Sequence, residues 1–173
     1  MRHLTAIALS ALIAAAATPA FAANEWGIEH ERKARFEATV VDVVCEIAGD
    51  CAPQCGAGKR QLGLLTDDGT LVLAAKNFDI FAGTHVDLAP HCGKRILADG
   101  LMIDDPLATL FVLQFVKPLP DGEWSRANKF TKTWAAANPG KKGNQWFKHE
   151  PKVLNELEKN GILGLPGVEY IEE

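Results

Sequence analysis

CEIAGDCAPQCGAGKRQ (residues 45–61) and PHCGKRILADG (residues 90–100) together hold all four cysteines of the chain and decide how it folds. The first stretch contains Pro53 and three glycines, so it cannot continue a regular element and predicts a compact loop. The second brings the last cysteine in just before a strand. The segment from Cys45 to Cys92 is therefore the part around which the remaining elements are arranged.

The N-terminus has the pattern of a secretory signal peptide. Arg2 gives it a positive start, an apolar run follows that is too short to span a bilayer, and Ala20-Phe21-Ala22 supplies a small-x-small cleavage site. No cysteine for a lipid anchor follows the apolar run, and no later stretch approaches the ~20 apolar residues of a membrane helix. We therefore expect a periplasmic or secreted protein of about 150 residues, the size of a single domain.

Charge is distributed unevenly along this expected mature chain. Without the signal it holds 17 basic and 22 acidic residues, a formal charge of −5. Residues 117–152 carry eight Lys/Arg against three acids, a net of +5, so the remainder carries −10. Two solvated faces of opposite sign are the simplest interpretation of this asymmetry.

Export determines how the cysteines are interpreted. In an oxidising compartment an even number of cysteines indicates disulfides, and four cysteines allow three pairings. The disulfide candidates are Cys45, Cys51, Cys55 and Cys92. A bridge from Cys92 to one of the other three would constrain the unfolded chain more than a local Cys51–Cys55 bridge, because it closes a longer loop.

Five segments have the composition of β-strands, with many β-branched, aromatic and aliphatic residues. They span residues 36–45, 61–65, 70–74, 94–103 and 109–116. An Asp-Gly turn at residues 66–69 predicts that the second and third strands form a hairpin. Gly100 interrupts the fourth strand, which predicts a bulge or sharp bend. Residues 75–90, which include an apolar cluster of Phe78, Ile80 and Phe81, predict a short helix or an ordered loop.

Two helices are predicted after the strands. Ser125 is expected to cap a helix that runs to about Ala137. Its apolar residues share one stripe at helical spacing: Ala127, Phe130, Trp134 and Ala137. Pro151 suits the first turn of a second helix that Gly161 ends. The expected buried side of this helix consists of Val153, Leu154 and Leu157.

Five strands with an irregular segment between the third and the fourth match the order of an OB-fold, a five-stranded Greek-key barrel. HCGKRILADGLMI (residues 91–103) resembles the fourth strand of small exported bacterial OB-fold proteins, in which a Gly-Lys pair leads into a strand with a central Asp-Gly. The resemblance covers about residues 36–116. The predicted fold class is mainly β with C-terminal helices (α+β), a five-stranded OB-like barrel followed by two helices packed on it. The predicted divisions are a signal peptide (1–22), an N-terminal arm (23–35), the barrel (36–117) and a helical C-terminal extension (118–173).

Cysteine and histidine also allow an alternative to disulfides, a periplasmic metal or thiol-redox site. Thiolates with an imidazole suit copper or zinc, and the candidate ligands are Cys51, Cys55, His91 and Cys92. The C-x3-C pair with a distant histidine resembles, locally, the copper site of the copper chaperones of cytochrome oxidase assembly. Those proteins have a thioredoxin-like fold and a proline after the second cysteine, where this chain has Gly56. A redox-active C-x3-C pair near Lys59 and Arg60 is the third possibility, since cations lower a thiol pKa.

Recognised catalytic motifs are absent from the sequence. It has no G-x-S-x-G, H-E-x-x-H or Walker motif, and Ser125 is the only serine after the signal, which argues against a serine hydrolase. Basic and aromatic residues provide candidate contacts to a protein or an anionic polymer of the cell envelope, whereas nucleic acid is an improbable partner after export. The candidate partner-binding residues are Lys59, Arg60, Lys141, Lys142 and Trp146. The leading hypothesis is an exported, disulfide-stabilised, non-enzymatic binding or accessory protein without a cofactor.

Overall fold

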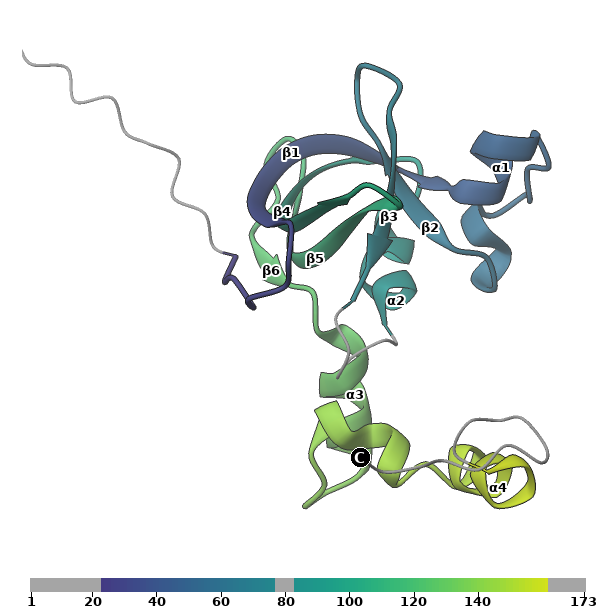
Figure 1. Ribbon diagram of the computed structural model, residues 1–173. Helices are drawn as coiled ribbons and strands as arrows, with labels where there is room; N and C mark the ends of the chain where they lie inside the picture. Colours follow the sequence, from purple (N-terminus) through teal and green to yellow (C-terminus); the bar gives the residue numbers. More distant parts are fainter. Residues whose placement is uncertain (1–22, 77–82, 162–173) are drawn as a thin grey trace, which may run out of the picture.

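The computed structural model describes residues 23–76 and 83–161. They form a closed five-stranded β-barrel with a sixth short strand, followed by helices (Figure 1). The strands are β1 (Glu31–Asp42), β2 (Leu62–Leu65), β3 (Leu71–Ala75), β4 (Arg95–Asp105), β5 (Ala108–Pro118) and β6 (Ser125–Arg126). The α-helices are α1 (Val43–Ala48), α2 (Thr84–Leu88), α3 (Lys129–Ala137) and α4 (Pro151–Asn160). Short 3-10 helices are η1 (Cys55–Gly58), η3 (Ala89–His91) and η4 (Gly143–Lys148).

Strand pairing confirms the predicted OB-like barrel. The order is β3-β2-β1-β4-β5-β6, and a parallel pairing of β3 with β5 closes the barrel. The long strand β1 reaches both neighbours, because Thr39 stands opposite Leu65 of β2 and also opposite Arg95 of β4. The predicted hairpin is present as β2 and β3. The register shift predicted at Gly100 lies between Asp99 and Gly100.

Alternating side chains from all five barrel strands fill the interior. Phe111 of β5 is fully buried, and Phe36 of β1 meets it edge-on with ring centroids 4.8 Å apart. The other fully buried aliphatic side chains of the barrel include Val40, Leu62, Leu64, Ile96 and Ala98. Within the described ranges, no helix has the length and apolar character needed to cross a membrane. The predicted signal peptide, like the Phe78–Phe81 cluster, lies outside the described residues.

The first strand differs from its predicted limits at both ends. β1 begins at Glu31 inside the expected N-terminal arm, since residues 31–39 pair with β4. It ends at Asp42, and Cys45 lies in α1 instead of a strand. The Asp42 side chain accepts hydrogen bonds from the backbone amides of Val44 and Cys45 and so caps a helix. This cap outweighs the strand preference of the consecutive valines.

The third helix begins later than predicted, because Ser125 belongs to β6 instead of capping α3. The backbone amide of Lys129, at the start of α3, donates to Asp87 of α2 over 3.0 Å. Asp87 also forms a buried ion pair with Lys76, with 2.8 Å between Nζ and Oδ2. Burial lowers the pKa of Lys76, and the carboxylate of Asp87 opposes that shift. A side chain distant in sequence therefore sets where α3 starts.

The fourth helix has the predicted ends but not the predicted buried side. Pro151 opens α4 and Gly161 caps it. None of its residues is buried, and Leu154 and Leu157 are 45% and 39% exposed. α4 contacts η4, and it stands apart from the barrel in Figure 1. The prediction that Val153, Leu154 and Leu157 form a buried side is therefore wrong.

Candidate functional site

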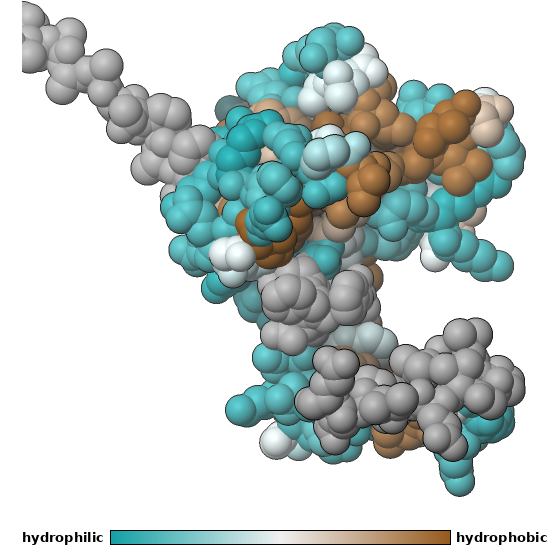
Figure 2. All heavy atoms as spheres, in the orientation of Figure 1, coloured by the Kyte–Doolittle hydropathy of each residue, from teal (hydrophilic) through white to brown (hydrophobic). Residues whose placement is uncertain are grey.

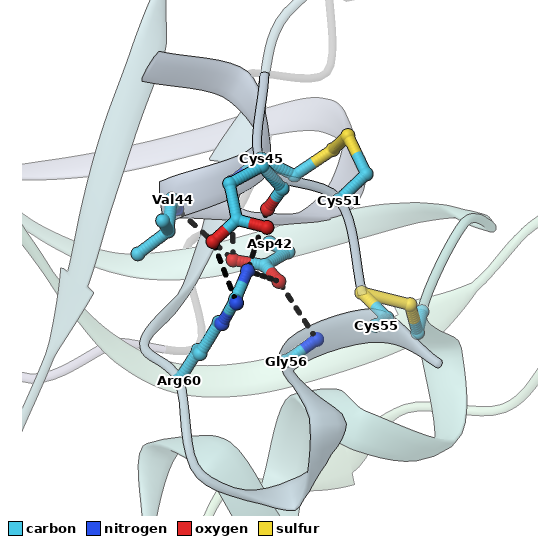
Figure 3. The surroundings of a disulfide bond; sticks show 9 residues. Asp42, Val44, Cys45, Cys51, Cys55, Gly56 and Arg60 are labelled. Carbon is cyan, nitrogen blue, oxygen red and sulfur yellow. Dashed lines mark hydrogen bonds and ion pairs between the residues drawn. A yellow bond between two sulfur atoms is a disulfide. The ribbon is translucent and has the colours of Figure 1, made fainter. Parts of the chain in front are cut away.

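Two disulfides brace the loop between β1 and β2. Cys45 bonds Cys51 within the loop, and Cys55 bonds Cys92, which follows η3 (Figure 3). The prediction of disulfides is confirmed, and the pairing is one of the three that the sequence left open. The second bridge joins parts of the chain 37 residues apart, so it ties the loop to the segment that enters β4.

Disulfide formation removes the thiolates that the candidate metal site would need. Cys51 and Cys55 belong to different bridges, and Cys92 is bonded to Cys55, so the three sulfurs of the set are not thiolates in this state. His91 lies next to Cys92 in η3. Over the described parts of the chain, no group of three or more His, Cys, Asp or Glu side chains is arranged to hold a metal ion. Binding of copper or zinc to a reduced form stays an untested alternative.

Asp42 organises the same loop from inside. Its side chain is 5% exposed. Oδ1 accepts from the amide of Val44 over 2.9 Å, and Oδ2 accepts from the amide of Gly56 over 3.2 Å. Arg60 Nη1 lies 3.6 Å from Oδ2, and Arg60 Nη2 also pairs with Asp50 over 2.9 Å (Figure 3). One carboxylate thus holds the start of α1, the start of η1 and the end of the loop together.

These contacts give Arg60 a structural place that the sequence did not show. Its guanidinium is engaged inside the loop, which reduces its availability to a partner. Lys59 next to it is exposed. Of the two predicted contact residues in this loop, Lys59 is the one whose side chain faces solvent.

An apolar patch lies on the outer side of this braced loop, and we name it the α1–β3 patch (Val44, Ile47 and Leu73). Ile47 is 72% exposed, and Val44 and Leu73 are each 38% exposed. α1 contacts β3, and Figure 2 shows apolar surface continuing over α1 and the neighbouring strands. Gly63 of β2 permits this packing, because a Cβ there would lie 2.9 Å from Cγ2 of Val43. The patch therefore lies on a helix whose position is fixed by the Asp42 cap, the Cys45–Cys51 disulfide and packing on β2.

The basic C-terminal region contains a second feature, a hollow of about 260 Å³ between η3, β6 and α3. Arg126, Lys129 and Lys132 line it together with His91. Burial lowers the pKa of His91, and the positive charges of Lys94 and Lys129 lower it further. The hollow is therefore positively charged, although Asp87 also lines it.

The other predicted contacts of the C-terminal region are separated in the structure. Lys141 and Lys142 are exposed. Trp146 packs edge-on against Phe130 of α3, with ring centroids 5.1 Å apart. Trp146 is half-buried, and its ring packs η4 against α3. It therefore has a structural role in this region.

Three features of this site were missed by sequence reasoning. Val44 and Ile47 were not singled out, because the segment up to Cys45 has the composition of a strand. Asp42 had a local signal, since an aspartate directly before a helical turn is a preferred N-cap. Its contacts with Gly56 and Arg60 had no such signal, because they depend on the tertiary structure.

Comparison of the chain with family models, with curated proteins and with solved structures finds no match.

Proposed function

We propose that this chain is an exported, disulfide-stabilised binding or accessory protein that uses the α1–β3 patch to dock a protein partner and catalyses no reaction. The two disulfides indicate an oxidising, extracellular or periplasmic setting. Cleavage of a signal peptide before residue 23 is part of the proposal.

The exposure of Ile47 on a rigid element carries the proposal. A single exposed apolar residue is ordinary in a folded protein. A cluster of them on an element fixed by a disulfide, a buried carboxylate cap and a glycine contact is typical of an interaction site. Covering the side chain of Ile47 fully would contribute about 1.5–3 kcal/mol to a complex.

The position of the patch in the barrel supports the same conclusion. OB-folds bind oligonucleotides and oligosaccharides on the face of strands 2 and 3 and on the loops between strands 1 and 2 and between strands 4 and 5. Leu73 lies on β3, and α1 belongs to the connection from β1 to β2. An apolar surface there favours an apolar protein surface as partner over the charged polymers that basic patches attract.

The polar groups beside the patch support binding over catalysis. Asp42 and Arg60, which Figure 3 shows beside the bridges, are engaged in structural contacts: Asp42 accepts from the backbone amides of Val44 and Gly56, and Arg60 pairs with Asp42. The sequence also lacks the recognised nucleophile and metal motifs.

Site-specific photo-crosslinking tests this proposal. A photoreactive amino acid placed at Ile47 in the exporting cell should give a discrete covalent adduct with one protein. The control position is Leu107, which is apolar and 95% exposed but lies on the turn between β4 and β5. Adding Leu73→Lys should abolish the adduct formed from position 47, since it introduces a charge into the patch.

Charge reversal of the basic region provides the contrast. The double variant Lys141→Glu/Lys142→Glu should leave the adduct from position 47 intact. Loss of the adduct in that variant, with persistence in Leu73→Lys, would place the contact in the basic region. Identical adducts from positions 47 and 107 would contradict a specific docking surface.

A further inference from the structure

The first described residue of the chain is buried against an acid in the barrel wall. Ala23 is 3% exposed, and its backbone nitrogen donates to Oδ1 of Asp99 over 2.9 Å. Asp99 lies on β4 beside the bulge and is fully buried. A buried carboxylate strongly favours a positively charged partner over a neutral one.

The next residue is held equally specifically. The backbone amide of Asn24 donates to Oε1 of Gln114 over 3.0 Å, and the Gln114 amide group donates to the carbonyl of Asn24 over 2.7 Å. Gln114 lies on β5 and is 7% exposed. Asp99 of β4 and Gln114 of β5 thus form a binding site for the backbone of residues 23 and 24.

The second oxygen of Asp99 has a different partner. Nε of Arg35, on β1, donates to Oδ2 over 2.7 Å, and Nη2 of the same guanidinium also bonds that oxygen. The guanidinium lies over the ring of Trp124, 4.9 Å from its centroid. The carboxylate therefore directs one oxygen to Arg35 and the other to the nitrogen of Ala23.

The sequence places a processing site at the same point. Ala20-Phe21-Ala22 is a small-x-small motif, after which a signal peptidase cuts. Cleavage breaks the bond between the carbonyl carbon of Ala22 and the nitrogen of Ala23. Water supplies a hydroxyl to Ala22 and a hydrogen to Ala23, and the new amine takes one more proton at neutral pH.

We propose that signal-peptide cleavage after Ala22 creates an α-ammonium group on Ala23 that forms a buried ion pair with Asp99 and locks the N-terminus into the barrel. In the mature protein an ammonium group replaces the neutral peptide N–H at this position, so the hydrogen bond to the Asp99 carboxylate becomes an ion pair. Processing and folding are coupled in this way, because only a chain that begins at residue 23 places a charge on that nitrogen. The device is independent of the α1–β3 patch.

Two proteins that differ only in this charge test the pairing. One begins at Ala23 with a free amine, and the other carries an acetyl group on the same nitrogen. Acetylation keeps an N–H donor and removes the charge, so the comparison isolates the ion pair. We expect the free amine to lower the unfolding equilibrium constant in urea about tenfold, which corresponds to about 1.4 kcal/mol. Equal stability of the two proteins would overturn the proposal.

Asp99→Asn provides the matched control. The difference between the free and the acetylated N-terminus should disappear in this variant, because the carboxylate charge is gone. A difference that persists unchanged in Asp99→Asn would contradict the assignment of the partner.

Reactivity of the amine gives a second readout if Asp99→Asn does not fold. In the native wild-type protein, acylation of the Ala23 amine should be at least about tenfold slower than in urea, measured against the exposed Lys141 and Lys142. Equal rates, or a mature mass that begins at another residue, would overturn the proposal.

Discussion

At the scale of single residues, Gly100 shows most directly how sequence specifies this barrel. A Cβ at this position would overlap the carbonyl oxygen of Val112 and lie 2.9 Å from Cζ of Phe111. The glycine allows β4 and β5 to approach at the bulge, where the register shifts. The sequence predicted this feature because a glycine inside a strand is typical of a bulge, a tight bend or a close backbone approach.

Gly100→Ala should therefore destabilise the protein by about 3 kcal/mol, since the clash is with backbone that cannot rotate away. Urea unfolding measures the change. Gly69→Ala is the control: beyond the glycine and its two chain neighbours, no atom lies within 4 Å of the place that its Cβ would take, so only its φ of +85° adds a cost, of about 1 kcal/mol. A Gly100→Ala cost no larger than that of Gly69→Ala would show that the strands can separate at the bulge.

His91 makes folding sensitive to mild acid. Its pKa in the folded protein is lowered from 6.5, chiefly by burial and further by Lys94 and Lys129. As the pH falls, His91 is therefore protonated in the unfolded chain at a higher pH than in the folded protein. The free energy of unfolding consequently falls as the pH drops below about 6.5. His91→Gln should flatten this fall between about pH 6.5 and pH 5. If the free energy of unfolding had the same slope against pH in the wild type and in His91→Gln, burial of the His91 imidazole would be contradicted.

Elements, in contrast, were predictable only where their signals are local. The hairpin of β2 and β3 follows from an Asp-Gly turn between apolar runs. α4 follows from a proline at its start and a glycine at its end. The helix α1 was not predictable in the same way, because valines and a cysteine favour a strand until Asp42 caps them and Gly63 makes room for Val43.

The disulfides, too, were predictable from the sequence only in part. Their presence follows from an even number of cysteines and from the export that the N-terminal sequence predicts. Their pairing does not, since it depends on η3 bringing Cys92 beside Cys55. The Asp99 receptor for Ala23 was equally unpredictable, because it needs β4 folded against residues far earlier in the chain.

The two bridges should differ in their contribution to stability. Cys45–Cys51 spans 6 residues and Cys55–Cys92 spans 37. By loop-closure entropy, replacing the first pair with serines should cost about 2 kcal/mol and replacing the second about 4 kcal/mol. Urea unfolding of the two double variants measures both costs. The reverse order would show that native contacts and not loop length decide them.

The two disulfides should have the opposite order of importance for partner binding at the α1–β3 patch. Cys45→Ser/Cys51→Ser releases the end of α1, and so it should weaken the adduct from position 47 more than Cys55→Ser/Cys92→Ser does in protein that remains folded. The smaller loop is thus expected to matter more for the patch, and the larger loop more for the fold.

At the scale of the whole molecule, the chain combines a closed barrel, a loop held by disulfides and a C-terminal extension that lies partly apart from the barrel. The fold class was predictable because five strands in this order have few ways to close. The α1–β3 patch was not, because the exposure of Ile47 follows from the path of α1 and not from its composition.

The central claim is that all four sulfur atoms serve as covalent braces. The decisive experiment is intact-mass measurement of the native protein after alkylation, before and after reduction, with metal analysis on the same sample. We expect no alkylated cysteine before reduction and four after it, with peptides linked as Cys45–Cys51 and Cys55–Cys92. Two or more alkylated cysteines in the native protein, together with stoichiometric copper or zinc, would contradict it.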